Sequence, residues 1–224
     1  MENLPLYISI VFGLTTILAL LIFVKAANNS VATLVILLTW LGGQTAIGLS
    51  GFYTVTKGFP PRFMLAVFPA LLCIILLFAT AKGRKYIDGL NMRFLTILHI
   101  VRIPVELVLY WLFLYKAVPK LMTFEGRNFD IFAGLTAPLL FYFAFIKKRA
   151  GRALLLAWNF VCLGLLLNIV VLALLSAPFS FQQLAFDQPN IAVLYFPFLW
   201  LPCCVVPLVL FSHLAAIRQL IKRK

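Results

Sequence analysis

Four polar side chains recur at helical spacing inside one apolar stretch, and their types are the ones best suited to chemistry. The stretch starts at Phe94 and holds His99, Arg102, Glu106 and Tyr110. At 100° per residue, the four positions fall within an arc of about 80° on one helix face. Arg102 and Glu106 lie one turn apart and could form an ion pair. The pattern predicts an interior stripe in which Arg102 attracts an anionic group or holds Glu106 ionised, and Glu106 carries a proton.

Three prolines lie where an apolar helix would need its backbone hydrogen bonds. Pro104 falls between Arg102 and Glu106 and cannot donate to the carbonyl of Ile100, so a kink is expected. Pro202 and Pro207 interrupt the last apolar stretch. Discontinuous membrane helices are typical of transport sites, and these three residues are therefore predicted to be helix bends.

Further polar residues are candidates for the same pathway. Asn168 and Gln44 lie deep in two other apolar stretches and are expected to face the interior. Glu125, Arg127 and Asp130 are concentrated in six residues of one connection. That connection is either the place where a ligand from outside first meets charge or a solvated turn bent at Gly126.

Several established chemistries lack their residues in this sequence. The last apolar stretch has no lysine for a retinal Schiff base, and the two histidines do not form a His-x-x-x-His pair for zinc. All four cysteines lie within apolar runs, where they are expected to be small buried hydrophobes. We therefore assign no catalytic residue, metal ligand or cofactor.

Composition defines the elements that must position these residues. Of the 224 residues, 64% are hydrophobic and 11% are charged, and the mean hydropathy is +1.07. A soluble domain has about 25% charged residues, so an all-α membrane protein is predicted. Seven apolar stretches suit a single seven-helix transmembrane domain that fills the chain: residues 4–24, 31–52, 63–81, 94–118, 131–146, 153–175 and 196–217. The fifth is short, and Asn128 or Asp130 would cap it.

The basic residues predict the orientation of this domain. Thirteen Lys and Arg lie in one set of alternate connections and in the C-terminal tail, and five lie in the opposite set. The positive-inside rule places the thirteen in the cytoplasm, with the N-terminus outside the cell. This distribution also explains the net charge of +13 without a nucleic-acid partner. The location expected is the plasma or inner membrane.

Three further features concern packing. Gly42, Ala46 and Ser50 recur every four residues as a ridge of small residues, on which a neighbouring helix or a second copy could pack. Similar dipeptides in the second and sixth stretches, and Phe-Pro before the third and seventh, suggest a 3+1+3 arrangement like that of small seven-helix sugar carriers. The long connection Pro178–Tyr195 is expected to be an aromatic interfacial belt more than a lid over the bundle.

These observations favour a small membrane transporter or channel-like protein, with a small molecule or a proton as its substrate. The alternative is a non-transporting membrane module that binds a lipid, a quinone or a partner protein, with an Arg102–Glu106 pair that is purely structural. A membrane-embedded enzyme comes third, because no nucleophile–base set is recognisable.

Overall fold

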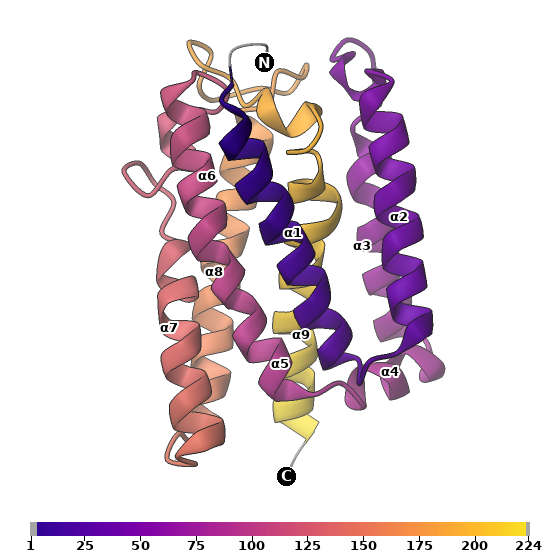
Figure 1. Cartoon of the computed structure of the whole chain (residues 1–224), viewed down its shortest axis with the longest axis vertical. Helices are drawn as coiled ribbons and strands as arrows, with labels where there is room; N and C mark the ends of the chain where they lie inside the picture. The colour runs from indigo at the N-terminus through magenta and orange to yellow at the C-terminus, as the bar shows by residue number, and fades with distance from the viewer. Residues whose placement is uncertain (1–3, 223–224) are drawn as a thin grey trace.

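The computed structural model describes residues 4–222, which form a bundle of helices (Figure 1) and contain no strand. The principal elements, in chain order, are α1 Leu6–Ala26, α2 Val31–Leu49, α3 Met64–Ala79, α4 Ala81–Asp88, α5 Met92–Leu98, α6 Arg102–Leu114, α7 Ile131–Phe141, α8 Arg152–Leu175 and α9 Val206–Lys222. A 3₁₀ turn, His99–Val101, joins α5 to α6. Two π-helical turns, Tyr142–Ile146 and Leu201–Val205, extend α7 and precede α9. Each of the seven predicted stretches thus contains a helix.

Five of these helices are long and apolar enough to cross a membrane, and six if α3 and α4 count as one span. The five are α1, α2, the continuous Met92–Leu114, α8 and Leu201–Lys222. Between α3 and α4 the chain turns by 92°. Thr80 caps the start of α4 by accepting a hydrogen bond from the Gly83 amide at 3.1 Å.

The last helix lies about five residues further along the chain than the sequence predicted. It starts at Leu201 and continues to Lys222. The basic residues that were expected to follow it are one helical turn apart, and both bind the Asp88 carboxylate: Arg218 Nε at 2.9 Å and Lys222 Nζ at 2.7 Å. This ion pair with α4 holds the final turn in helical form.

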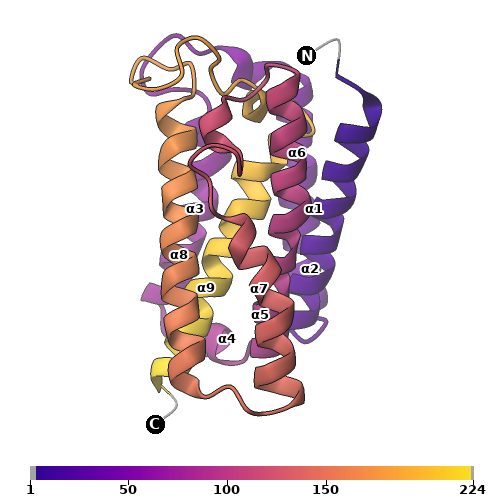
Figure 2. The same ribbon diagram turned by 90° about the vertical axis from the view of Figure 1, so that its left-hand side faces the viewer.

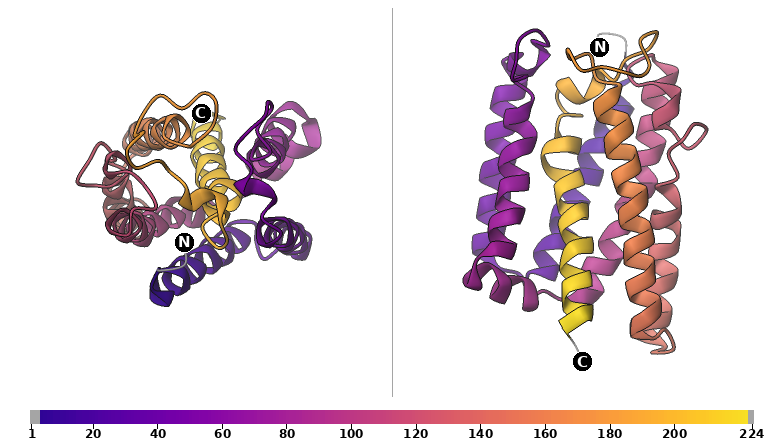
Figure 3. Two further views of the ribbon diagram at one scale, coloured as in Figure 1. Left: turned by 90° about the horizontal axis from the view of Figure 1, so that it is seen from above. Right: turned by 180° about the vertical axis from the view of Figure 1, so that it is seen from behind.

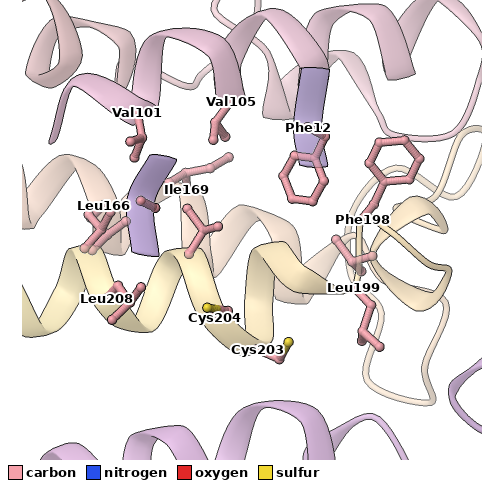
Figure 4. Close-up of a cluster of buried hydrophobic side chains, with 14 of the residues drawn as sticks. Phe12, Val101, Val105, Leu166, Ile169, Phe198, Leu199, Cys203, Cys204 and Leu208 are labelled. Atoms are coloured by element: carbon pink, nitrogen blue, oxygen red, sulfur yellow. The ribbon is translucent and has the colours of Figure 1, made fainter. Parts of the chain in front are cut away.

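The core surrounds α9, which lies at the centre of the bundle when viewed from its end (Figure 3). Of the span Leu201–Lys222, 72% is buried, compared with 17% of α2. Figure 4 shows Val101 and Val105 facing Leu166, Ile169 and Leu208 across this core, with Phe12 next to Phe198. The helices α1, α5, α6 and α8 therefore pack around α9.

The hairpin of α2 and α3 stands apart from this core (Figure 1). In α2 only Leu41, Gln44 and Gly48 are buried. The ridge of Gly42, Ala46 and Ser50 is exposed, and a Cβ added to Gly42 would meet no atom within 4 Å. No helix within residues 4–222 packs on that ridge, and contact with a second copy stays a prediction.

Helix α7 starts about halfway down the bundle, and the irregular segment before it descends from the end of α6 (Figure 2). The carbonyl of Arg127 accepts a hydrogen bond from Asn168 at 2.8 Å, and Asn168 lies about 10 Å below the end of α8. From Ile131 to Ile146 the helix spans only about 24 Å. Irregular backbone at membrane depth requires cover from protein, and Asn128 and Asp130 are indeed buried.

The connection Pro178–Tyr195 lies across the end of the bundle, as a lid would (Figure 1), while Phe181 and Phe186 are exposed, as a belt requires. Gln188 donates to the carbonyls of Phe113 and Val118 at 3.0 and 2.6 Å, and Phe179 is buried. These bonds satisfy backbone carbonyls at the end of α6, which explains why the segment folds inward.

The helix geometry changes locally next to the three prolines at which bends were predicted. The 3₁₀ turn lies directly before the turn that holds Pro104, and the first π turn of the last helix holds Pro202, with Pro207 just beyond it. The span Met92–Leu114 nevertheless remains one helix. Pro104 has no backbone N–H to donate, and the 3₁₀ turn before it accommodates this loss without breaking the helix.

Candidate functional site

Arg102 is the centre of a buried polar cluster contributed by α6 and the turn before it, by α8 and α9, and by the segment before α7. Its side chain is 3% exposed, and its Nη1 donates to Asp130 Oδ1 at 2.8 Å and to the carbonyl of Cys162 at 3.3 Å. Its Nη2 lies 3.0 Å from His213 Nε2. We call the buried side chains His99, Arg102, Glu106, Asn128, Asp130, Asn159 and His213 the polar centre.

The bonds of His213 define its protonation state. Because the guanidinium only donates, His213 Nε2 must accept, which places the ring proton on Nδ1. That nitrogen lies 2.9 Å from Asn159 Oδ1, and Asn159 Nδ2 donates to the Leu155 carbonyl at 2.8 Å. The chain of donors and acceptors from α8 to Arg102 is therefore complete with a neutral His213.

His99 packs on this chain without bonding to it. Its ring stacks on that of His213 with centroids 3.8 Å apart and planes 16° apart, and Trp158 lies beside both rings, with its centroid 5.3 Å from that of His99 and 5.7 Å from that of His213. Neither ring nitrogen of His99 has a hydrogen-bond partner among residues 4–222. His99 is therefore held by packing and keeps both nitrogens available.

Glu106 occupies the other side of the polar centre, one turn beyond Arg102. Its Oε1 accepts from Asn128 Nδ2 at 2.5 Å. Asn128 also donates to the Met122 carbonyl at 3.0 Å and accepts from the Asp130 amide at 3.0 Å. Glu106 Oε2 is buried and has no partner in the described chain.

A glycine lets α7 approach the Arg102 turn closely enough for these bonds. A Cβ on Gly134 would lie 2.8 Å from Ile103 Cγ1, 3.0 Å from the Ile103 amide nitrogen and 3.3 Å from Arg102 Cβ. The first of these distances is too short for any real side chain, so Gly134 sets the spacing between Asp130 and Arg102.

The ion pair predicted between Arg102 and Glu106 is not formed. Within residues 4–222, the ion pair of Arg102 is with Asp130. The descending segment before α7 brings an acid and an amide into the bundle, and each takes one of the predicted partners: Asp130 binds Arg102 and Asn128 binds Glu106. A helical wheel of one stretch cannot include such residues from another.

The structure brings together three of the six predicted pathway residues, His99, Arg102 and Glu106. Tyr110 stacks with Phe124 at 5.0 Å instead. Asn168 is exposed and binds the Arg127 carbonyl. Gln44 is buried between α2 and α3, where its Oε1 accepts from the Tyr53 hydroxyl at 2.7 Å, and so satisfies a different site.

The three charges predicted to share the outer connection are separated. Glu125 lies 4.0 Å from Lys120 with 43% of its side chain exposed, and Arg127 is exposed. Asp130 is 5% exposed and belongs to the polar centre. Asp130 does hold the predicted position before α7, but its side chain makes no cap bond because it binds Arg102.

From the sequence alone, Asn159 and His213 had no role in the site, Asn128 was a candidate only as a cap, and Asp130 was placed either in the outer connection or as a cap. One available signal was the length of the fifth stretch. A helix of 16 residues from Ile131 to Ile146 is shorter than the about 20 residues of a membrane crossing, which indicates that the polar residues before it extend the same segment.

The two cavities described in the structure lie away from the polar centre. One lies between the α2–α3 hairpin and α9, and a smaller one lies beside Phe52 and Arg62. Neither is lined by a residue of the polar centre.

Comparison with known proteins gives one match. A family model described as a domain of unknown function, DUF8737, matches residues 59–221, which include α3 to α8, nearly all of α9 and the whole polar centre. No curated protein matches the chain, and neither does any solved structure. Since the family model covers well over half of the chain, the protein belongs to the DUF8737 family.

Proposed function

We propose that this protein is a small membrane transporter or channel-like protein in which Glu106 takes up and releases a proton. The observation that carries the proposal is the buried Oε2 of Glu106, which has no hydrogen-bond partner within residues 4–222, whereas Oε1 is bonded to Asn128. Ionisable groups inside membrane helices mark ion and proton pathways. The free oxygen is the position at which a proton would be held.

The other members of the polar centre support this role by fixing Glu106 and its surroundings. Asp130 neutralises Arg102, so the guanidinium no longer offers its full charge to an anionic substrate. Asn128 links the two halves, since it binds Glu106 and the Asp130 amide. His99, with two unpaired nitrogens, is the next group able to accept a proton towards the α5 end of the bundle.

A second function is favoured by the pairing of Arg102, whose two terminal nitrogens are bonded although its Nε has no partner within residues 4–222. Three acceptors bind this side chain, as expected for a charge network that only fixes helix packing. In that case the protein is a non-transporting membrane module. An embedded enzyme is not favoured by any observation.

The topology is part of the proposal. Seven spans require that α3, and α7 with its descending segment, each cross the bilayer, and the 92° turn after α3 then leaves α4 at the cytoplasmic end. The basic residues then place the N-terminus outside and the C-terminus in the cytoplasm of the plasma or inner membrane. The 3+1+3 relation between the two ends of the chain stays a prediction.

Proton flux tests the role of Glu106. Purified protein is reconstituted in liposomes that contain a pH-sensitive dye, and a potassium gradient with valinomycin drives protons inward. We expect flux with the natural protein and with Glu125→Gln, a half-exposed acid of the connection between α6 and α7, and background flux with Glu106→Gln.

Two results overturn the assignment. One is an absence of proton flux at both polarities with the natural protein. The other is unchanged flux with Glu106→Gln, provided that thermal unfolding shows a folded variant. Glu106→Asp, which keeps the acid on a shorter side chain, should retain part of the flux and separates loss of the proton site from loss of the fold.

Labelling tests the topology. Single cysteines are placed at Lys148 and Gln188 in a variant without the natural cysteines, and a membrane-impermeant maleimide is added to intact cells. The proposed topology predicts labelling of the cysteine at position 188 only. Labelling of the cysteine at position 148 alone would show that the orientation is the opposite one.

A further inference from the structure

A lateral groove separates the α2–α3 hairpin from the rest of the bundle. Its volume is about 470 Å³, within the range of about 300–1,000 Å³ for ligand sites. Its walls are α2 from Ser30 to Trp40, α3 from Pro69 to Leu77, Tyr86 of α4, Phe23 of α1 and the start of the last helix. The hairpin stands beside α9 along this length (Figure 3).

The groove is closed at one end and polar at the other. At the closed end, Trp40 Nε1 donates to the Cys203 carbonyl at 2.8 Å and bridges α2 to the last helix. At the other end lie the hydroxyls of Ser30, Thr33 and Tyr86, two of which, Thr33 Oγ1 and Tyr86 Oη, are 3.1 Å apart. Between the two ends the walls are almost wholly apolar, so water has few partners there.

Two lysines of α4 closely precede Tyr86, which lines the polar end of the groove. Lys82 precedes Tyr86 by one turn on α4 and so shares its face, and Lys85 is adjacent to Tyr86. Both lysines are exposed, and neither forms an ion pair within residues 4–222. The nearby acid, Asp88, is already bound by Arg218 and Lys222. The opening of the groove therefore carries uncompensated positive charge.

The dimensions of the groove select its occupant. From Ser30 to Trp40 the groove extends about 15 Å. Along that length the walls are almost wholly apolar, as burial of a hydrocarbon chain requires. An extended hydrocarbon chain fits, and the lysines suit a phosphate at the end of it.

We propose that the lateral groove binds one acyl chain of an anionic phospholipid, with the lipid phosphate at Lys82 and Lys85. The chain fills the space that α2 and α3 leave beside α9, and so supports a hairpin that has little packing of its own. The bend between α3 and α4 lays α4 across the end of the groove, where its lysines meet the headgroup layer. This site requires a membrane location but is independent of proton flux through Glu106.

Photo-crosslinking tests the site. Phosphatidylglycerol and phosphatidylcholine with the same diazirine-bearing acyl chain are incorporated into nanodiscs with the full-length protein, and crosslinked peptides are mapped by mass spectrometry. We expect phosphatidylglycerol crosslinks on the groove-facing parts of α2 and α3. Lys82→Gln and Lys85→Gln should each lower the preference for phosphatidylglycerol about fivefold, the equivalent of about 1 kcal/mol. Lys148→Gln, in another connection, should leave it unchanged.

Filling the groove gives a second test. Ala70→Trp places a large ring in the lateral groove and should abolish these crosslinks, whereas Leu72→Trp, on α3 outside the groove, should not. A measurement without substitution uses Cys73, which lines the groove and is exposed, while the other three cysteines are buried. In lipid-stripped protein, phosphatidylglycerol should slow maleimide modification of Cys73 more than phosphatidylcholine does.

Three results overturn the proposal. Equal crosslinking by both lipids at the groove makes the occupant a neutral chain and removes the role of the lysines. Crosslinks spread evenly over the outer helix faces, with Cys73 unprotected, mean that the groove holds no specific lipid. If neither lipid slows modification of Cys73, and if Ala70→Trp converts an oligomer of the natural protein to monomer, the occupant is a second protein chain.

Discussion

Replacing Asp130 by asparagine tests whether Arg102 pairs with Asp130, as observed, or with Glu106, as expected from their helix alone. The substitution preserves shape and one acceptor oxygen but leaves Arg102 without a countercharge at 3% exposure. Removing one partner of a buried pair costs about 3–5 kcal/mol. Since the new amide and the Cys162 carbonyl still accept from Arg102, we expect a smaller loss, of about 2–3 kcal/mol, close to one charged hydrogen bond.

A double-mutant cycle makes this expectation specific. Unfolding in mixed detergent micelles is measured for Arg102→Gln, Asp130→Asn, Glu106→Gln and the two double variants that include Arg102→Gln. The contacts predict a coupling of about 2 kcal/mol between Arg102 and Asp130, and a clearly smaller coupling between Arg102 and Glu106. Asp187→Asn, on an exposed acid, should be neutral. A larger coupling with Glu106 would refute the arrangement of the polar centre.

Three further predictions concern other parts of the chain. Gly134→Ala should cost about 1–3 kcal/mol by overpacking against α6, whereas Gly164→Ala, which would meet nothing within 4 Å, should be neutral or stabilise α8; thermal unfolding of both measures the difference. Hydrogen bonds from Arg218 and then Lys222 hold the pKa of Asp88 below its usual value, so this carboxylate contributes stability that is fully present above about pH 4 and lost as pH falls. On acidification, Asp88→Asn should lose less stability than the natural protein, and thermal unfolding of both at several pH values measures the difference. This difference should be at most about 1 kcal/mol, because solvent reaches the site. Tyr53→Phe should cost about 1–3 kcal/mol in stability, because it leaves the buried carboxamide oxygen of Gln44 without a donor. Unfolding of the two proteins in urea measures this loss.

The sequence was sufficient for the helices because each depends on local information. Long apolar runs flanked by charge predict membrane-length helices, and Ile131–Ile146 has the predicted bounds. The errors fall at ends that are determined by distant contacts. The final helix extends to Lys222 because Asp88, far away in the sequence, binds its last turns.

The polar centre was predictable only in the part that lies on one helix. His99, Arg102 and Glu106 share a face because they share a period of 3.6 residues. Their partners come from the segment before α7 and from α8 and α9, and no periodicity relates those positions. Gln44 shows the opposite error. It was expected to join the same polar interior, but it accepts a hydrogen bond from Tyr53, nine residues along the chain.

The late start of α7 explains why this bundle can hold so many ionisable groups together. A full-length helix would place only side chains at the depth of Arg102, and its backbone amides would bond to one another. Because Ile131 is the first residue of α7, the amide of Asp130 is free to bind Asn128 at that depth. Asn128 can then use its side-chain amide for Glu106 and for the Met122 carbonyl. The irregular backbone thus supplies the hydrogen bonds that keep a second acid inside the bundle, and within residues 4–222 the second carboxylate oxygen of Glu106 receives none of them.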